Sequence, residues 1–153
     1  MAEVLGIDLG TTNTVIAGRV QGGKVTTVGD AESNTLMPSV VSFHPNGTVL
    51  VGQPAKDRRV IDARNTLYSI KRLIGRSWDS PEVQRARNRF PFEMREGPGH
   101  APLVIARGQT YTLPEISAFV LRKAKQAAER AMGTTVDRAV ITVPANFNDL
   151  QRA

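Results

Sequence analysis

A short polar turn between two apolar segments holds the residues of this sequence whose types could do chemistry. Val4–Leu9 can form a buried strand, and Val15–Val20 can form a second one. The turn between them combines a carboxylate, a glycine, two threonines and an asparagine, at Asp8, Gly10, Thr11, Thr12 and Asn13. The pattern predicts a strand-turn-strand unit with a polar tip of the size of a phosphate group.

The residue types in this turn suit a metal-bound nucleotide phosphate. Gly10 lacks the Cβ atom that would keep an oxyanion away from the backbone. Backbone amides around such a turn can form an anion-binding concavity, and Thr11 and Thr12 add hydroxyl donors. Asp8 is placed to hold a hydrated Mg²⁺, which prefers oxygen ligands and keeps several waters. The alternative is an ordinary hairpin, in which Gly10 and Asn13 serve only as turn residues.

The turn belongs to neither of the two common phosphate-binding motifs. No GxxxxGK[ST] sequence occurs, which argues against a P-loop, and no GxGxxG opens a helix, which argues against a Rossmann dinucleotide site. The surrounding sequence must therefore decide between a nucleotide site and a plain hairpin.

Length and composition are those of an ordinary globular domain. The chain has 153 residues, of which 41% are hydrophobic and 22% charged, and this is enough for one domain with a core. It has no cysteine, so disulfides and thiolate metal sites are excluded. No apolar run approaches the roughly 20 residues that span a bilayer, and no basic and apolar leader opens the sequence. We expect a cytoplasmic protein without a membrane partner.

The net charge of +6 raises the question of nucleic acid. Part of the excess lies in Arg85–Arg89, which holds three arginines, and part in Arg122, Lys123, Lys125 and Arg130. These residues are dispersed, aromatic residues make up only 5% of the chain, and no nucleic-acid motif is present. We therefore expect solvated helix faces and no nucleic-acid partner.

Three further groups of strands and helices can be predicted before the long helix. An antiparallel meander is expected from strands at Val4–Leu9, Val15–Val20, Lys24–Val28, Ser39–Phe43 and Thr48–Val51. Short helices are expected at Gln53–Arg59, Leu67–Leu73 and Pro81–Arg89. Short strands are expected near Phe92–Arg95, Leu103–Ala106 and Gln109–Thr112. This order places a mixed helical and strand region after the meander.

The clearest helix covers Pro114–Met132. Proline suits the first helical position, and Gly133 suits the left-handed C-terminal cap. One apolar stripe at helical spacing is expected to face the core: Ile116, Val120, Ala124, Ala127 and Ala131. A buried strand at Arg138–Val143 should follow, and then the beginning of another helix at Asn148.

Together these elements predict an α/β protein, a ribonuclease-H-like lobe that carries an inserted mixed α+β subdomain. Because the chain stops within the final helix, we expect that one lobe is present and the rest of the domain is absent.

Four further segments support a resemblance to a known family. In order and spacing they are similar to the N-terminal part of the 70-kilodalton heat-shock chaperone family (DnaK-type), over essentially all of the chain: Asn34–Val41, Val51–Lys56, Asn65–Arg76 and Ala139–Asp149. Actin-like filament proteins and sugar kinases share the phosphate turn. They would not be expected to match Val51–Lys56 or Ser69–Arg76, so the resemblance favours the chaperone family.

The resemblance implies an actin-like ATPase domain with ATP in a cleft between two lobes. This chain resembles lobe I alone, with a core subdomain at residues 1–38 and 113–153 and an inserted subdomain at 39–112. Lobe II and the peptide-binding domain are expected to be absent.

The resemblance also assigns roles to the turn and to a lysine. Asp8 should orient Mg²⁺ through water, and the stretch from Gly10 through Thr11 and Thr12 to Asn13 should wrap the β- and γ-phosphates of ATP or ADP. Lys71 matches the family's catalytic lysine near the γ-phosphate and the attacking water. Phosphoryl transfer depends on positioning and charge stabilisation, which an ammonium group can supply. Without the resemblance, Lys71 reads as a surface lysine on an amphipathic helix.

Two residues near the end match an allosteric relay of the family. Pro144 resembles its proline switch, and Arg152 resembles the partner arginine that helps to pass the nucleotide state to the peptide-binding domain. A strand-ending proline and a solvated arginine are the alternatives. Asn146 stands where the family usually has tyrosine, which could alter this relay.

Two functions remain open from the sequence. The full-length parent would be an ATP-dependent chaperone that hydrolyses Mg-ATP to control peptide binding in protein folding and heat-shock stress. Its partners would be unfolded client peptides, a J-domain co-chaperone and a nucleotide-exchange factor. The fragment alone would instead be a nearly inactive half-site, a scaffold or interaction module whose exposed cleft face favours self-association. His44 and His100 lie far apart in loops, without a carboxylate cluster, so no histidine metal site is expected.

Overall fold

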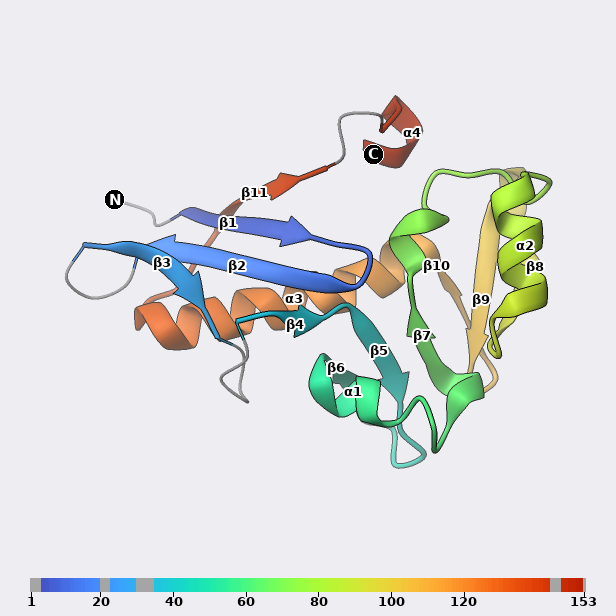
Figure 1. Ribbon diagram of the computed structural model, residues 1–153, viewed down its shortest axis with the longest axis horizontal. Coiled ribbons are helices and arrows are strands. Elements are labelled where there is room, and N and C mark those ends of the chain that lie inside the picture. Colours follow the sequence, from blue (N-terminus) through green and yellow to red (C-terminus); the bar gives the residue numbers. More distant parts are fainter. Residues whose placement is uncertain (1–3, 20–22, 30–34, 144–146, 153) are drawn as a thin grey trace.

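The early strands form a sheet, and the region of residues 40–112 lies to one side of it (Figure 1). The computed structural model describes residues 4–19, 23–29, 35–143 and 147–152. Its main sheet has the order β11-β1-β2-β3, with β4 also paired to β2. These strands are β1 (Val4–Leu9), β2 (Asn13–Arg19), β3 (Val25–Val28), β4 (Met37–Pro38) and β11 (Arg138–Thr142). The pairs β1–β2 and β2–β3 are antiparallel, as the predicted meander requires, whereas β11 runs parallel to β1.

A long helix, α3 (Leu113–Met132), lies along one face of this sheet and packs against β1 and β2 (Figure 1). Its start is fixed by a capping box, in which the Thr112 side chain accepts from the Glu115 amide and the Glu115 side chain accepts from the Thr112 amide. Gly133 ends the helix in the left-handed conformation, with a φ of 69°. Both ends lie within one residue of the predicted bounds.

The buried face of α3 differs from the predicted stripe in its last turn. Ile116, Val120, Ala124 and Ala127 are buried as expected. Ala131, however, is exposed, whereas Ala128 and Met132, which were not predicted, are buried. At 100° per residue, Ala131 still lies within about 20° of Ala124 around the helix axis, so the helical spacing alone does not account for its exposure.

The chain between β4 and α3 begins with a second, three-stranded sheet. This sheet has the order β6-β5-β7 and consists of β5 (Val40–Phe43), β6 (Val49–Val51) and β7 (Thr66–Tyr68). The strands predicted at Ser39–Phe43 and Thr48–Val51 therefore belong to this sheet and do not continue the meander of β1 to β3. The short helices α1 (Gln53–Asp57) and η1 (Ala63–Asn65) connect β6 to β7. The hydroxyl groups of Ser42 and Thr66 are fully buried and hydrogen-bond to each other at 2.9 Å across β5 and β7, which satisfies two polar groups that burial would otherwise destabilise.

The predicted helix at Leu67–Leu73 is wrong. Its first part is strand β7, in which the fully buried Leu67 pairs with Val41 of β5. Ser69 then adopts a left-handed conformation (φ 58°, ψ 26°), which breaks any helix that would cross it. Only Ile70–Arg72 is helical, as the 3₁₀ turn η2. Tertiary pairing with β5 therefore overrides the local helical pattern.

A third sheet, with the order β10-β9-β8, completes this region. Its strands are β8 (Glu93–Glu96), β9 (Pro102–Ala106) and β10 (Gln109–Thr112), and the 3₁₀ turn η3 (Pro98–His100) joins β8 to β9. Helix α2 (Pro81–Arg89) precedes them, and the Ser80 side chain caps it by accepting from the Val83 amide at 3.3 Å.

Aromatic rings join this region to the long helix. Phe43 of β5 stacks on Tyr111 of β10, with ring centroids 4.7 Å apart, and meets Phe119 of α3 edge-on at 5.7 Å. The buried side chains of all three sheets and α3 form one hydrophobic cluster. No helix in the described ranges is both long and apolar enough to cross a membrane.

Strand β11 is at the predicted place, but it is not buried. All five of its residues are exposed, and Val140 and Ile141 keep 61% and 42% of their surface accessible. Parallel strands carry apolar runs because both of their faces are usually covered. Here the strand forms the edge of the sheet, with β1 as its neighbour on one side, and the apolar run remains accessible.

The last described element, α4 (Asp149–Arg152), approaches the turn that follows η2. A Cβ atom on Gly75 would lie 2.7 Å from the Gln151 amide nitrogen and 2.8 Å from its Cα, and Gly75 has a φ of +70°. Both the close approach and the left-handed conformation therefore require glycine at this position.

We expect Gly75→Ala to weaken the docking of α4 by about 1–3 kcal/mol, because the added methyl group overlaps the Gln151 backbone. Faster hydrogen exchange at the α4 amides would report the loss. Gly108→Ala is the matched control, since Gly108 has a similar φ of +72° and open space around its Cβ position. Equal exchange in the two variants would show that the contact with Gln151 does not hold α4.

Candidate functional site

The polar turn between β1 and β2 is closed by its own backbone. The Gly10 amide donates to the Asn13 carbonyl at 3.0 Å. A Cβ atom on Gly10 would lie only 2.2 Å from that carbonyl oxygen. The turn therefore requires glycine at position 10 even without a bound anion, because a side chain here would break the hydrogen bond that closes the turn. The sequence alone did not indicate this requirement.

Ser39, which the sequence analysis did not single out, fastens the turn to the neighbouring strand. Its hydroxyl donates to the Gly10 carbonyl at 2.9 Å and pairs with the buried Thr14 hydroxyl at 2.8 Å. Because a serine hydroxyl has one hydrogen, Thr14 must donate in the second bond. The Ser39 amide also donates to the Thr12 carbonyl at 2.9 Å. Its sequence position, beside apolar residues and after a proline, carries no signal for this role.

Asp8 lies at the carboxyl end of β1, beside the carboxyl end of the parallel strand β11. The register pairs Asp8 with Thr142, and the Thr142 hydroxyl donates to Asp8 Oδ1 at 2.8 Å. Asp8 is exposed. Ligands of α/β folds bind outside the carboxyl ends of parallel strands, so the position suits a ligand-binding carboxylate. The role of Thr142 was also missed, because it depends on pairing across 134 positions.

Lys71 reaches the same place from the region between β4 and α3. It lies on η2, and its ammonium group donates to the Leu9 carbonyl across 62 positions of sequence. The buried side chains of Ile70 and Leu73 anchor this segment in the core. The Lys71 ammonium also lies 5.7 Å from the ring centroid of Phe147. Lys71 is thus half-buried against the polar turn, which the alternative of a solvated surface lysine does not explain.

A cavity of about 20 Å³ lies between the turn, η2 and α3. Its polar lining includes Gly10, Thr11, Ser39, Lys71 and Ser117. This volume is enough for about one water molecule. A phosphate group would therefore have to lie on the outer side of the turn, where Thr12 and Asp8 are exposed.

Of the two residues assigned to the allosteric relay, the structure describes Arg152. Arg152 is exposed on α4, and its backbone amide donates to the Asn148 carbonyl at 3.1 Å. Pro144 and Asn146 lie outside the described residues. The relay assigned to Pro144 and Arg152 stays a prediction.

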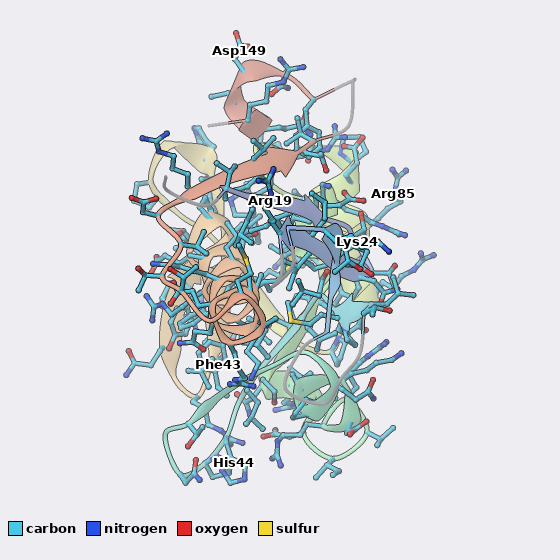
Figure 2. All side chains as sticks on the ribbon, turned by 90° about the vertical axis from the view of Figure 1, so that its left-hand side faces the viewer. Arg19, Lys24, Phe43, His44, Arg85 and Asp149 are labelled. Carbon is cyan, nitrogen blue, oxygen red and sulfur yellow. The ribbon has the colours of Figure 1, made fainter. Side chains whose placement is uncertain are left out.

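The two histidines lie away from the turn. His44 is at the tip of the β5–β6 hairpin (Figure 2), where its Nδ1 accepts from the Asn46 amide at 3.1 Å. His100 Nδ1 lies 2.5 Å from Glu96 Oε1, and this hydrogen bond and the negative charge of Glu96 raise the pKa of His100. Among the residues that the structure describes, no three His, Cys, Asp or Glu side chains gather as a metal cluster.

The turn with its carboxylate, at residues 8–13, and the lysine thus come from two separate parts of the chain and meet where β1 ends. A family model described as Hsp70 protein matches residues 4–153. The match includes Asp8, the turn from Gly10 to Asn13, Lys71 and Arg152, and it covers nearly the whole sequence. This chain therefore belongs to the Hsp70 family.

Proposed function

We propose that this chain supplies the phosphate-binding half of the Mg-ATP site of an ATP-dependent chaperone. Members of the Hsp70 family are generally ATPases with chaperone activity and the actin-like ATPase fold, and the several sheets of this mixed α/β chain are consistent with that fold. The observation that carries the proposal is the bond from the Lys71 ammonium to the Leu9 carbonyl, because it brings a positive charge from a distant segment to the base of the turn.

The amides and hydroxyls that follow Gly10 are the proposed phosphate donors. The Gly10 amide is occupied inside the turn by the Asn13 carbonyl. The backbone amides of Thr11, Thr12 and Asn13 and the two threonine hydroxyls are therefore the groups that could meet the β- and γ-phosphates. Ser39 acts as a positioning residue, because it holds the Gly10 and Thr12 carbonyls away from the anion.

Asp8 fits a hydrated magnesium ion. Mg²⁺ in nucleotide sites keeps several waters and uses one or two carboxylates together with substrate phosphates, so one exposed carboxylate is a suitable donor set. Thr142 holds Oδ1 of Asp8, and Oδ2 can accept from metal-bound water. When bound, the ion would neutralise charge on the phosphate oxygens.

Lys71 is the proposed catalytic residue. An ammonium group has three donors, so the bond to the Leu9 carbonyl leaves two for a γ-phosphate oxygen and the attacking water. Its positive charge would stabilise the charge that develops on the transferred phosphoryl group. The left-handed Ser69 and the buried Ile70 fix the start of η2 and therefore the direction of this side chain.

The isolated chain is proposed to be a half-site. Asp8, Thr12 and Thr142 are all exposed, so the chain would contact ATP from one side only. Phosphoryl transfer depends on a water-poor, preorganised site, which a second lobe would have to complete. We propose residues 1–38 and 113–153 as the core of this lobe and 39–112 as its insertion. For the full-length parent we also propose the relay through Pro144 and Arg152 and a cytoplasmic location. Its partners would be those of a DnaK-type chaperone: client peptides, a J-domain co-chaperone and a nucleotide-exchange factor.

Isothermal titration calorimetry with Mg-ATP tests the site directly. We expect weak binding, which Asp8→Ala and Lys71→Ala each reduce by about tenfold or more. Asp8→Ala removes the proposed acceptor of the magnesium-bound water, and Lys71→Ala removes the proposed cationic donor to the phosphates; a hydrogen bond to a charged group is worth about 1.5–3 kcal/mol. Lys24→Ala is the matched control, since Lys24 is exposed and directly precedes β3, whose first residue pairs with Arg19 at the end of β2 away from the turn. Binding that all three variants leave unchanged would place ATP elsewhere.

ATP hydrolysis by the chain should stay near the rate of the protein-free control, as expected for a site that is open to water on one side. Phosphate release under multiple-turnover conditions measures this. Clear turnover that Lys71→Ala abolishes would contradict the half-site. It would show that the chain, alone or as a self-associated pair, completes the catalytic centre.

A further inference from the structure

A groove between η2 and α2 is separate from the phosphate turn. It has a volume of about 530 Å³, within the roughly 300–1,000 Å³ of ligand-binding clefts. Four arginines and two aromatic rings account for most of its lining: Arg72, Arg76, Arg85, Arg89, Tyr68 and Phe90. Lys71 does not line it, because successive residues of a 3₁₀ helix point roughly 120° apart, and Lys71 faces the turn.

The arginines form two rows. Arg72 and Arg76 stand on the η2 side. Arg85 and Arg89 lie one turn apart on the exposed side of α2, and Figure 2 shows Arg85 at the surface. Glu82 is the acidic residue of the lining and pairs with Arg76 at 3.5 Å. Four arginines and one glutamate give the groove a net charge of +3.

Arg85 and Arg89 are exposed, as expected of a solvated helix face, and they also line this groove. Like charges one helical turn apart destabilise a helix. Within the residues that the structure describes, Arg76 is the groove arginine that has a carboxylate within 4.0 Å. Arg87, the third arginine of α2, points elsewhere and lies over the Trp78 ring at 5.3 Å. Arg85 and Arg89 of α2 thus line the groove together with Arg72. Carboxylates do not neutralise the positive charge of these three arginines in the described structure.

The floor between the two rows is apolar. Tyr68 and Phe90 meet edge-on, with ring centroids 5.0 Å apart, and both rings are half-buried. Leu73 and Ala86 are buried beneath them. A ligand that fits must therefore carry negative charge on two sides and an apolar group in between.

We propose that this groove binds an acidic peptide segment that carries a large apolar side chain among its carboxylates. Guanidinium groups match carboxylates as planar, bidentate partners, and the aromatic floor would cover the apolar side chain. Nucleic acid fits less well, because its binding requires neutralisation of successive phosphates along an extended track, whereas this charge is confined to one groove. The proposal is independent of ATP binding at the turn.

Fluorescence anisotropy with labelled peptides tests this assignment without nucleotide. The probe is a fluorescein-labelled Glu-Glu-Leu-Glu-Glu peptide, and Glu-Glu-Ala-Glu-Glu and Lys-Lys-Leu-Lys-Lys are its controls. We expect saturable binding of the first peptide, weaker binding of the alanine peptide and none of the lysine peptide. Absence of binding by the leucine peptide, or equal binding of the leucine and alanine peptides, would overturn the proposal.

Paired charge removals locate the site. Arg85→Gln with Arg89→Gln should raise the Kd of the leucine peptide by at least about tenfold, because it removes two charge-assisted partners. Arg122→Gln with Arg130→Gln removes the same charge from exposed positions of α3 outside the groove and should leave the Kd within about twofold. Circular dichroism checks that each variant is folded, and Arg72→Gln tests the other row independently.

Two outcomes would contradict the groove assignment. Equal weakening by both double variants would show attraction to the net charge of the chain. Tighter binding of a labelled single-stranded oligonucleotide, lost in the Arg85→Gln and Arg89→Gln variant, would assign the groove to nucleic acid instead.

Discussion

The closed turn between β1 and β2 is the constraint on which the site depends. Its Gly10–Asn13 hydrogen bond leaves no space for a Cβ atom at position 10, and the Ser39 hydroxyl holds the same glycine from the adjoining strand segment. This geometry fixes the Leu9 carbonyl at the point where Lys71 binds. A change at Gly10 would therefore disturb the carboxylate, the donor amides and the lysine together, although the lysine comes from a distant part of the chain.

The region between β4 and α3 contributes residues to both the turn and the groove. Strand β7 pairs with β5, Ser69 turns the chain sharply, and η2 then presents two neighbouring residues to two different sites. Lys71 faces the phosphate turn, and Arg72 faces the arginine groove. A ligand in the groove would press on the same short 3₁₀ turn that positions Lys71, so the two sites share one structural element. The contact of Gly75 with Gln151 ties α4 to the end of this segment.

Sequence reasoning succeeded where a local pattern and the tertiary structure agree. The capped helix α3, the strands of the meander and the polar turn follow from caps, alternation and turn residues. It failed where contacts between residues far apart in the sequence determine the local structure. The Leu67 segment is a strand because β5 is its neighbour. Ser39 and Thr142 act through partners that spacing does not reveal, and the apolar run of β11 remains exposed because it forms a sheet edge. The family resemblance, rather than periodicity, made Lys71 a candidate, and the structure places its ammonium group against the turn.

The turn and Lys71 are proposed to form one phosphate site. The most direct test is to titrate the ¹⁵N-labelled protein with Mg-ATP and to follow its amide chemical shifts by NMR. This measurement detects the weak binding expected of a half-site. The account predicts saturable shifts that begin at Thr11, Thr12 and Asn13 and include the Lys71 segment, and Lys71→Ala should reduce them. Shifts confined to α2 and its arginines, or no shifts at millimolar nucleotide, would contradict the account.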